Sequence, residues 1–455
     1  MTTQSPDRLP FLLLAALLLI AFVCGGGGIG APLANLAVQL AALATLAFRR
    51  ESSAAFWRES PLSLRALIAL SIALPLAQII PLPEALWQSL PGRDAVTASL
   101  ALTGEDGAAQ WMPFSLDPRR TLLAASALVT PLAVLCIGWT LPRERLIDLG
   151  WGVVALGLVT VLIGAAQLAG GTEAATLYGS PHPGEMVLGT FANRNPAGLF
   201  LTFALGLAAL LPAPRPHPVV LPARLATCAL LLLTVALTQS RTALVLAVVP
   251  VLLGVLRGLS QRLPVHSTAR TAMIGLGALA LVAVGAGALV VTAPGRIAAT
   301  LERFETKDEP RRYIWDDALY TAGRHWPVGA GIGTFDTLSQ VDESLENLTM
   351  RRAGRAHNDY IEIAIEAGAP GLVLAALWLV LIAWLSWLAR ASKARWTAWA
   401  GSAFLLAIAL QSITDYPLRN QTILAFGAFA LLLLVRIAMR RPEREREPGH
   451  GRRVA

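Results

Sequence analysis

The chain has 455 residues, of which 55% are hydrophobic and only 15% charged, and its formal net charge is +8. A soluble protein of this length carries roughly 25% charged residues on its surface, so the composition excludes an ordinary soluble enzyme. The excess of arginine does not indicate nucleic-acid binding, because these residues stand in short clusters between apolar runs.

Apolar runs close to the roughly 20 residues that cross a membrane recur from end to end. They predict an all-α polytopic membrane protein with about 12 transmembrane helices. The first run follows Arg8 and could mimic a signal peptide, but a second run follows almost at once, so we expect a retained first helix. The expected helices lie near 11–26, 30–48, 62–82, 121–140, 148–169, 188–211, 223–239, 242–257, 272–292, 369–389, 397–412 and 421–438.

The loops between these runs fall into two sets with different charge. One set carries the arginine clusters, and the short loops of the other set hold only Arg241 and Arg419. The positive-inside rule therefore predicts that both termini are cytoplasmic, as in a multi-pass protein of the bacterial inner membrane. This topology divides the chain into 1–292 with nine helices and an outer loop at 83–120, a periplasmic loop at 293–368, helices 10–12 at 369–438, and a basic tail at 439–455.

The sequence shows no pattern typical of a metal or disulfide site. Cys24, Cys136 and Cys228 lie in apolar runs without CxxC spacing. No DxD motif or His/Asp cluster calls for a divalent cation, so we expect neither a metal nor a cofactor.

Two polar clusters interrupt apolar runs on the predicted outer side. Asn193, Arg194 and Asn195 begin the sixth run, where they favour either a polar cavity or a capped helix start at the interface. Arg241 lies in a short connection, against the positive-inside trend, and an arginine there can bind a phosphate bidentately or contact lipid head groups.

Within the periplasmic loop, a short amphipathic helix is predicted over 311–319, and its apolar face holds Ile314, Ala318 and Leu319. Arg311 and Arg312 at its start are candidates for contacts with a diphosphate. The following glycine-rich stretch, 329–335, predicts a tight turn, with an anion-binding nest as the alternative.

A second helix is predicted from Asn358 to Ala367, where Gly368 and Pro370 end it. Glu362 and Glu366 share one of its faces. His357 stands at its entrance, and a histidine among arginines and carboxylates is suited to proton transfer, although a structural histidine is the commoner case. In the last outer loop, Asp415 either orients an arginine or, as we expect, lies in a solvated turn.

Together these clusters resemble the O-antigen ligase and polymerase superfamily over residues 185–380. The resemblance is carried by five segments taken in order, which are Gly189-Thr-Phe-Ala-Asn-Arg-Asn195, Ser240-Arg-Thr242, Arg311 four residues before Trp315, Gly329-x-Gly-x-Gly-Thr-Phe335, and His357-Asn-Asp-Tyr-Ile361 leading to Gly368-Ala-Pro-Gly371. It implies a metal-independent glycosyltransferase of cell-surface polysaccharide biosynthesis. Such an enzyme moves a glycan from undecaprenyl diphosphate to lipid A–core or to a growing glycan, at the periplasmic face.

The resemblance also implies roles for single residues. Arg241 and Arg311 would bind the diphosphate, and His357 would act as general base on the acceptor hydroxyl or help to position it. The remaining candidates have supporting or auxiliary roles, and they are Arg312, Arg351, Arg352, Arg355, Asn193, Asn195, Asn358 and Asp359.

Three alternatives stay open. A polymerase of the same superfamily fits the sequence as well as a ligase does, and a protein-glycosylating member is weakly disfavoured. A transporter or flippase also suits about twelve helices, but the sequence lacks the internal repeat and the intramembrane acids typical of carriers.

Overall fold

The structure is a computed structural model that describes residues 7–104, 110–170, 175–179, 184–214, 217–260, 311–347 and 354–439. The ninth expected helix (272–292), Arg351, Arg352 and the basic tail beyond 439 lie outside the described residues. Within them the protein is almost entirely helical, with one two-stranded ribbon, β1 (Pro81–Leu82) and β2 (Met112–Pro113).

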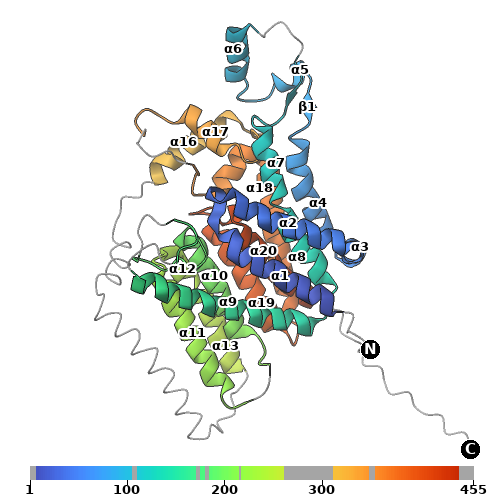
Figure 1. The fold of residues 1–455 in the computed structure, drawn as a ribbon. Helices are drawn as coiled ribbons and strands as arrows, with labels where there is room; N and C mark the ends of the chain where they lie inside the picture. Colours follow the sequence, from blue (N-terminus) through green and yellow to red (C-terminus); the bar gives the residue numbers. More distant parts are fainter. Residues whose placement is uncertain are drawn as a thin grey trace, which may run out of the picture.

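The helices pack into a bundle with a smaller helical part above it (Figure 1). They are α1 (Arg8–Cys24), η1 (Gly25–Gly30), α2 (Pro32–Phe48), α3 (Arg50–Glu59), α4 (Leu62–Ala77), α5 (Glu84–Trp87), α6 (Asp94–Thr103), α7 (Pro118–Ser126), α8 (Val129–Trp139), α9 (Arg143–Gly170), α10 (Arg194–Leu210), α11 (Val220–Leu237), α12 (Arg241–Leu246), α13 (Val248–Ser260), α16 (Arg311–Arg324), α17 (Phe335–Asp342), α18 (Asp359–Ala389), α19 (Arg395–Gln411), η2 (Pro417–Arg419) and α20 (Gln421–Ala438).

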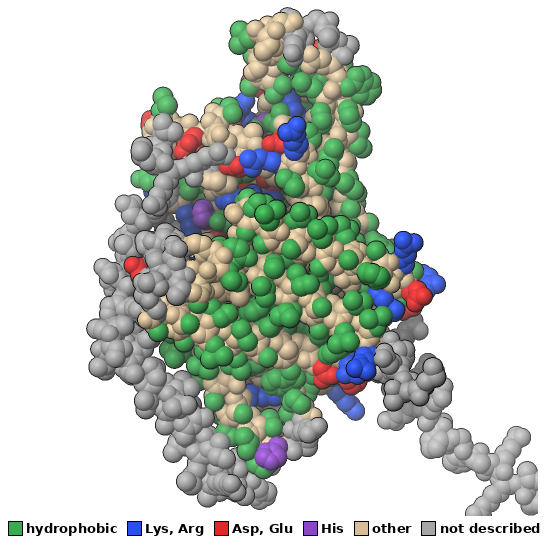
Figure 2. Space-filling view, viewed as in Figure 1, with side chains coloured by type: hydrophobic (Ala, Val, Ile, Leu, Met, Phe, Trp, Pro, Cys, Tyr) green, Lys and Arg blue, Asp and Glu red, His purple; other side chains and the backbone are tan. Residues whose placement is uncertain are grey.

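Each expected transmembrane segment among the described residues coincides with one or two of these helices. By length and composition, seven described helical segments can cross a membrane, or eight if α2 and α3, which meet at 82°, count as one span. The expected total of about 12 stays a prediction. Figure 2 shows a broad hydrophobic belt over α1 and α2, with charged side chains above and below it, as a lipid-facing surface requires.

Three helix boundaries differ from the sequence prediction. The segment after residue 48, expected as a loop, forms α3. The fourth expected helix is broken between Ser126 and Val129 into α7 and α8. The sixth begins only at Arg194, because the Asn193 side chain accepts the Asn195 N–H and caps the helix there.

The two sets of loops lie at opposite ends of the bundle. At one end Arg145 pairs with Asp7 at 3.0 Å, and Arg436 donates to the Leu141 carbonyl. At the other end, Asn420 donates to the Gly26 carbonyl, and Asp359 donates its N–H to the Ser412 carbonyl. The segregation of the arginine clusters that the sequence predicts is therefore present in the fold.

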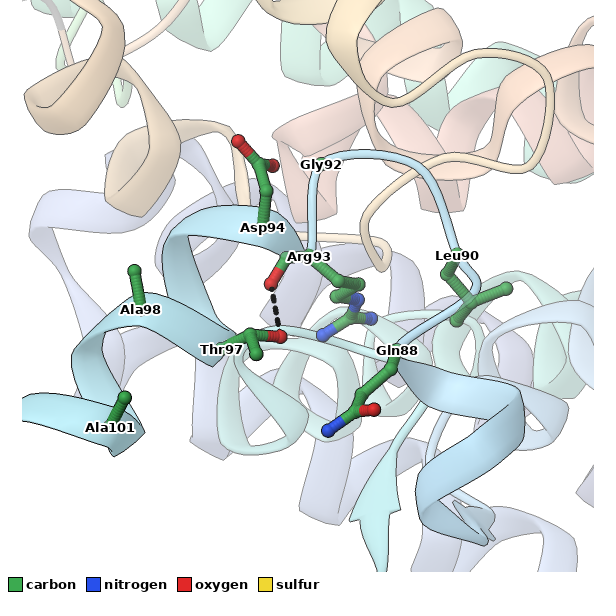
Figure 3. Close-up of a pocket in the computed structure, with 8 residues that line it drawn as sticks. All are labelled: Gln88, Leu90, Gly92, Arg93, Asp94, Thr97, Ala98 and Ala101. Carbon is green, nitrogen blue, oxygen red and sulfur yellow. Dashed lines mark hydrogen bonds between the residues drawn. The ribbon is translucent and has the colours of Figure 1, made fainter. Parts of the chain in front are cut away.

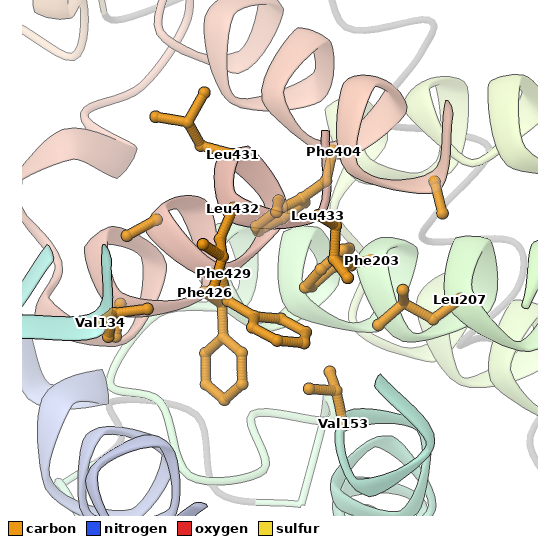
Figure 4. Close-up of a cluster of buried hydrophobic side chains, with 14 of the residues drawn as sticks. Val134, Val153, Phe203, Leu207, Phe404, Phe426, Phe429, Leu431, Leu432 and Leu433 are labelled. Carbon is orange, nitrogen blue, oxygen red and sulfur yellow. The ribbon is translucent and has the colours of Figure 1, made fainter. Parts of the chain in front are cut away.

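Helix α20 forms the centre of the core, with 83% of its apolar segment buried. Aromatic rings surround it, and Phe203 of α10 stacks on Phe404 of α19 with ring centroids 4.1 Å apart (Figure 4). At Gly401 a Cβ atom would lie 2.3 Å from the Ala430 carbonyl oxygen of α20. The absence of a side chain at this position therefore allows the two helices to touch.

We expect Gly401→Ala to destabilise the purified protein by about 1–3 kcal/mol, because the new methyl group overlaps backbone atoms that cannot move aside. The measurement is the thermal unfolding midpoint in detergent. Gly152→Ala in α9 is the matched control, since a Cβ there meets nothing within 4 Å and its midpoint should not fall. Equal midpoints for the two variants would contradict the packing argument.

Candidate active site

The candidate site is built on a short half-helix at the start of α18. The Asn358 side chain accepts the N–H groups of Tyr360 and Ile361 and so begins the helix. Gly368 breaks the helix with a left-handed φ of 56°. A side chain does not fit at this position, because a Cβ atom would lie 2.1 Å from the Pro327 carbonyl oxygen. Residues 359–367 thus form a unit distinct from the apolar part that follows, as the sequence predicts.

The glycine-rich turn holds the end of this half-helix. Ala330 and Gly331 donate their N–H groups to the carbonyls of Ile365 and Glu366, both at 2.9 Å. Ile332 donates to the Gln78 side chain, and Phe335 donates to the Glu366 carboxylate. Because these N–H groups are bound within the protein, the turn acts as a packing element and not as an anion-binding nest.

His357 precedes the half-helix in a left-handed conformation (φ of 51°), which is unusual for a residue other than glycine and is concentrated at functional sites. Its Nδ1 atom lies 3.5 Å from Oδ1 of Asp415, and its ring centroid lies 5.0 Å from that of Tyr416. The ring is 31% exposed, so one side is held by the protein while another remains open.

The loop from Ser412 to Asn420, called here the 412–420 loop, brings the predicted site residues together. Arg311 donates from Nη1 to the Thr414 carbonyl at 2.6 Å. Thr242, next to Arg241, places its hydroxyl 3.4 Å from that of Thr414. Together with His357 beside Asp415, this means that three segments far apart in the sequence meet at one loop.

The expectation that Asp415 lies in a solvated turn is wrong. Its side chain is only 2% exposed, and the titratable side chain beside it is His357 instead of an arginine. The reason is that the 412–420 loop folds inward against the half-helix, where Asp359 binds the carbonyls of Ser412 and Asp415. Burial, followed by the nearby Asp415 carboxylate, raises the pKa of Tyr416 in the same loop.

The arginines proposed for a diphosphate differ in their surroundings. Arg241 opens α12 after the capping residue Ser240 and is half-buried, and no described residue pairs with its guanidinium. Arg312 is exposed beside Arg311 on α16. Arg355 is different, because its Nη1 lies 2.9 Å from Oε2 of the buried Glu362 and its charge is neutralised there.

Helix α16 is longer than predicted and extends to Arg324. Ala318 and Ile314 face a small core beneath it, but Leu319 is 57% exposed, so its assignment to the apolar face is wrong. Trp315 donates from Nε1 to the Ala356 carbonyl at 2.8 Å. This bond ties the helix that carries Arg311 to the segment that carries His357.

The supporting asparagines also lie here. Asn193 caps α10 by accepting the Asn195 N–H. Asn195 accepts a hydrogen bond of 2.9 Å from the Ser240 hydroxyl, which precedes Arg241. The capped helix start is therefore confirmed, and it positions the connection that carries Arg241.

Sequence reasoning missed the most buried part of the site, an ion cluster around Arg419. Its guanidinium lies 2.6 Å from Glu366, 3.3 Å from Glu362 and 3.8 Å from Asp359. Burial by itself lowers the pKa of Arg419, but the three carboxylates outweigh this and raise it above its ordinary value. Two signals were present: an arginine against the positive-inside trend, and acids at positions 359, 362 and 366 on one helical face.

An open cavity of about 640 Å³ lies apart from this site, in the part formed by α5 and α6. Figure 3 shows the side chains that line it, among them Gln88, Arg93, Asp94 and Thr97. None of the predicted site residues lines it. Among the described residues, no group of three or more His, Cys, Asp or Glu side chains has the geometry of a metal site.

Comparison with known proteins bears on this arrangement. Residues 226–376 match the family described as O-antigen ligase. This stretch, about a third of the chain, is similar to O-antigen ligases. The matched region contains Arg241, Arg311 and His357 but ends before Asp415 and Arg419.

No curated protein matches the chain significantly. One solved structure, from work on a peptidoglycan synthase complex that coordinates polymerization and crosslinking, is 19% identical and covers 84% of this chain and 99% of its own, with a TM-score of 0.41.

We expect Arg419→Gln to destabilise the protein by about 3–5 kcal/mol, because it leaves three carboxylates buried without their shared cation. The loss should shrink at acidic pH, where protonation of Asp359 and Glu362 removes charge from the cluster. The measurement is the thermal midpoint at two pH values, with Arg119→Gln as the control because Arg119 is an exposed arginine of α7. A midpoint like that of the control at both pH values would contradict the assigned role of the cluster.

Proposed function

We propose that this protein transfers a glycan from an undecaprenyl diphosphate carrier to an acceptor hydroxyl at the periplasmic face of the inner membrane, as an O-antigen ligase does. The single observation that carries the proposal is the meeting of His357, Arg311 and the Arg241–Thr242 turn at the 412–420 loop. This meeting of segments supports a site in which His357 is the base and Arg241 and Arg311 are the cations.

The arginines supply what the leaving group needs. A lipid diphosphate gains negative charge as its bond to the sugar breaks, and positive charge fixed in advance stabilises that state. Arg241 has no described carboxylate partner, and Arg311 binds only a neutral carbonyl among the described residues, so the charge of both is available to the diphosphate. Guanidinium groups are well suited to this because they bind phosphate oxygens in pairs.

His357 supplies the base. Asp415 lies 3.5 Å from Nδ1 and favours the tautomer with the proton on Nδ1, which leaves the lone pair on Nε2 to accept the acceptor's hydroxyl proton. The acceptor oxygen then bonds to the anomeric carbon, the bond from that carbon to the diphosphate breaks, and the diphosphate leaves with the bonding electrons. Attack opposite the leaving group inverts the anomeric configuration.

The first test is envelope glycan analysis in a deletion strain complemented with His357→Ala, Arg241→Ala or Arg311→Ala. We expect each variant to accumulate carrier-linked glycan, because transfer stops after the donor has been made. Arg145→Gln, which removes a charge at the opposite end of the bundle, is the matched control and should restore the wild-type profile.

The accumulated material also separates ligase from polymerase. Long carrier-linked chains without capped lipopolysaccharide indicate a ligase that uses lipid A–core, whereas single repeat units on the carrier indicate a polymerase. Normal polysaccharide in all three variants, each present at wild-type level, would exclude this site.

A second prediction concerns Asp415 and His357 acting as a unit. Asp415→Asn should lower the transfer rate by about 10²–10⁴-fold. The neutral amide neither holds the imidazole in place nor stabilises its protonated form. The measurement is transfer by purified enzyme from a carrier-linked donor, and the double variant with His357→Ala should be no slower than His357→Ala alone. Multiplicative losses in the double variant would show that the two residues act separately.

A further inference from the structure

A second group of arginines lies at the end of the bundle opposite His357. Helix α10 runs for 17 residues from the site, about 25 Å, and ends at Leu210. There Arg224 of α11 donates to the carbonyls of Ala209 and Leu211 at 2.9 and 2.8 Å. Arg257 of α13 donates to the same two carbonyls at 2.8 and 2.9 Å.

The charges of this pair are not balanced by any described carboxylate. Both Nη1 atoms lie within 2.9 Å of the Ala209 oxygen, so they are no more than about 6 Å apart and repel each other. Carbonyls at a helix C-terminus attract a cation, which accounts for one arginine. A second guanidinium on the same two oxygens adds a positive charge that a bound anion would balance. In addition, the buried Nε of Arg257 has no hydrogen-bond partner.

The surroundings of the pair are those of a membrane interface. The Arg224 guanidinium lies over the Trp151 ring, 5.7 Å from its centroid, and the Trp151 indole donates to the Pro212 carbonyl. Tryptophan of this kind is typical of the head-group level. Leu225 beside Arg224 and Leu256 beside Arg257 are each at least half exposed, so apolar surface adjoins the two cations.

We propose that Arg224 and Arg257 together bind the phosphodiester of an anionic phospholipid, with its acyl chains against the exposed apolar faces of α11 and α13. The remaining guanidinium donors reach the phosphate oxygens while the α10 carbonyls hold the side chains in place. Both arginines are partly exposed and can be reached from the lipid phase. The site is separate from the glycan-transfer site and does not depend on the proposed function.

The test uses the full-length protein in uncharged detergent and follows its thermal midpoint as lipid is added. Phosphatidylglycerol should raise the midpoint of the wild type, and phosphatidylcholine or inorganic phosphate at the same concentration should raise it far less. In Arg224→Gln/Arg257→Gln the phosphatidylglycerol response should need on the order of tenfold more lipid. Arg145→Gln, whose arginine is already paired with Asp7 at the same end, should respond like the wild type.

Three results would overturn the proposal. They are an unchanged phosphatidylglycerol response in the double variant, an equal response of the wild type to phosphatidylcholine, and a full response to inorganic phosphate, which would assign the pair to a free anion. If the double variant does not fold, Arg257→Lys replaces it. This variant keeps the charge but loses the paired donors, so it should bind phosphatidylglycerol more weakly than the wild type in native mass spectrometry, and equal binding would also overturn the proposal.

Discussion

The geometry of the candidate site depends on one buried ion cluster, in which Arg419 joins the 412–420 loop to the half-helix of α18. The loop carries Asp415 and Thr414, and the half-helix follows His357, so the cluster fixes the distance between the two halves of the site. Removing one member of such a cluster is costly because the others remain charged in a medium that solvates them poorly. An apolar contact would hold the two segments together as firmly, but it would not fix how one segment is rotated relative to the other. Three carboxylates around one guanidinium fix this rotation, because their contacts are directional.

The cluster also separates the arginines of this end into two classes. Arg355 and Arg419 are neutralised by carboxylates of the half-helix, which makes them structural. Arg241 and Arg311 have no carboxylate partner among the described residues, and they lie where segments from three parts of the chain converge. A protein that must bind a diphosphate needs this separation, because a cation already paired with an acid has little attraction left for a substrate.

Much of the fold could be predicted from the sequence, because burial in lipid requires long apolar helices and segregated charge. The break at Gly368 was also visible, since glycine and proline mark it. The inward course of the 412–420 loop was not. A short polar connection usually faces water, and only the distant acids at 359, 362 and 366 show that Arg419, and with it Asp415, turns toward the protein. Pairing across more than fifty residues leaves no local pattern.

The two exceptions to the positive-inside trend lie in the same part of the structure. Arg241 and Arg419 are the only cations on the short loops that the sequence predicts to be outer, and both adjoin the candidate site. A cation on the outer side opposes the preferred orientation of a membrane protein, so it persists where the structure or the substrate uses its charge. At the opposite end arginines are common and orientation alone explains most of them. There the informative feature is not an arginine as such but two arginines on the same two carbonyls, which orientation does not require.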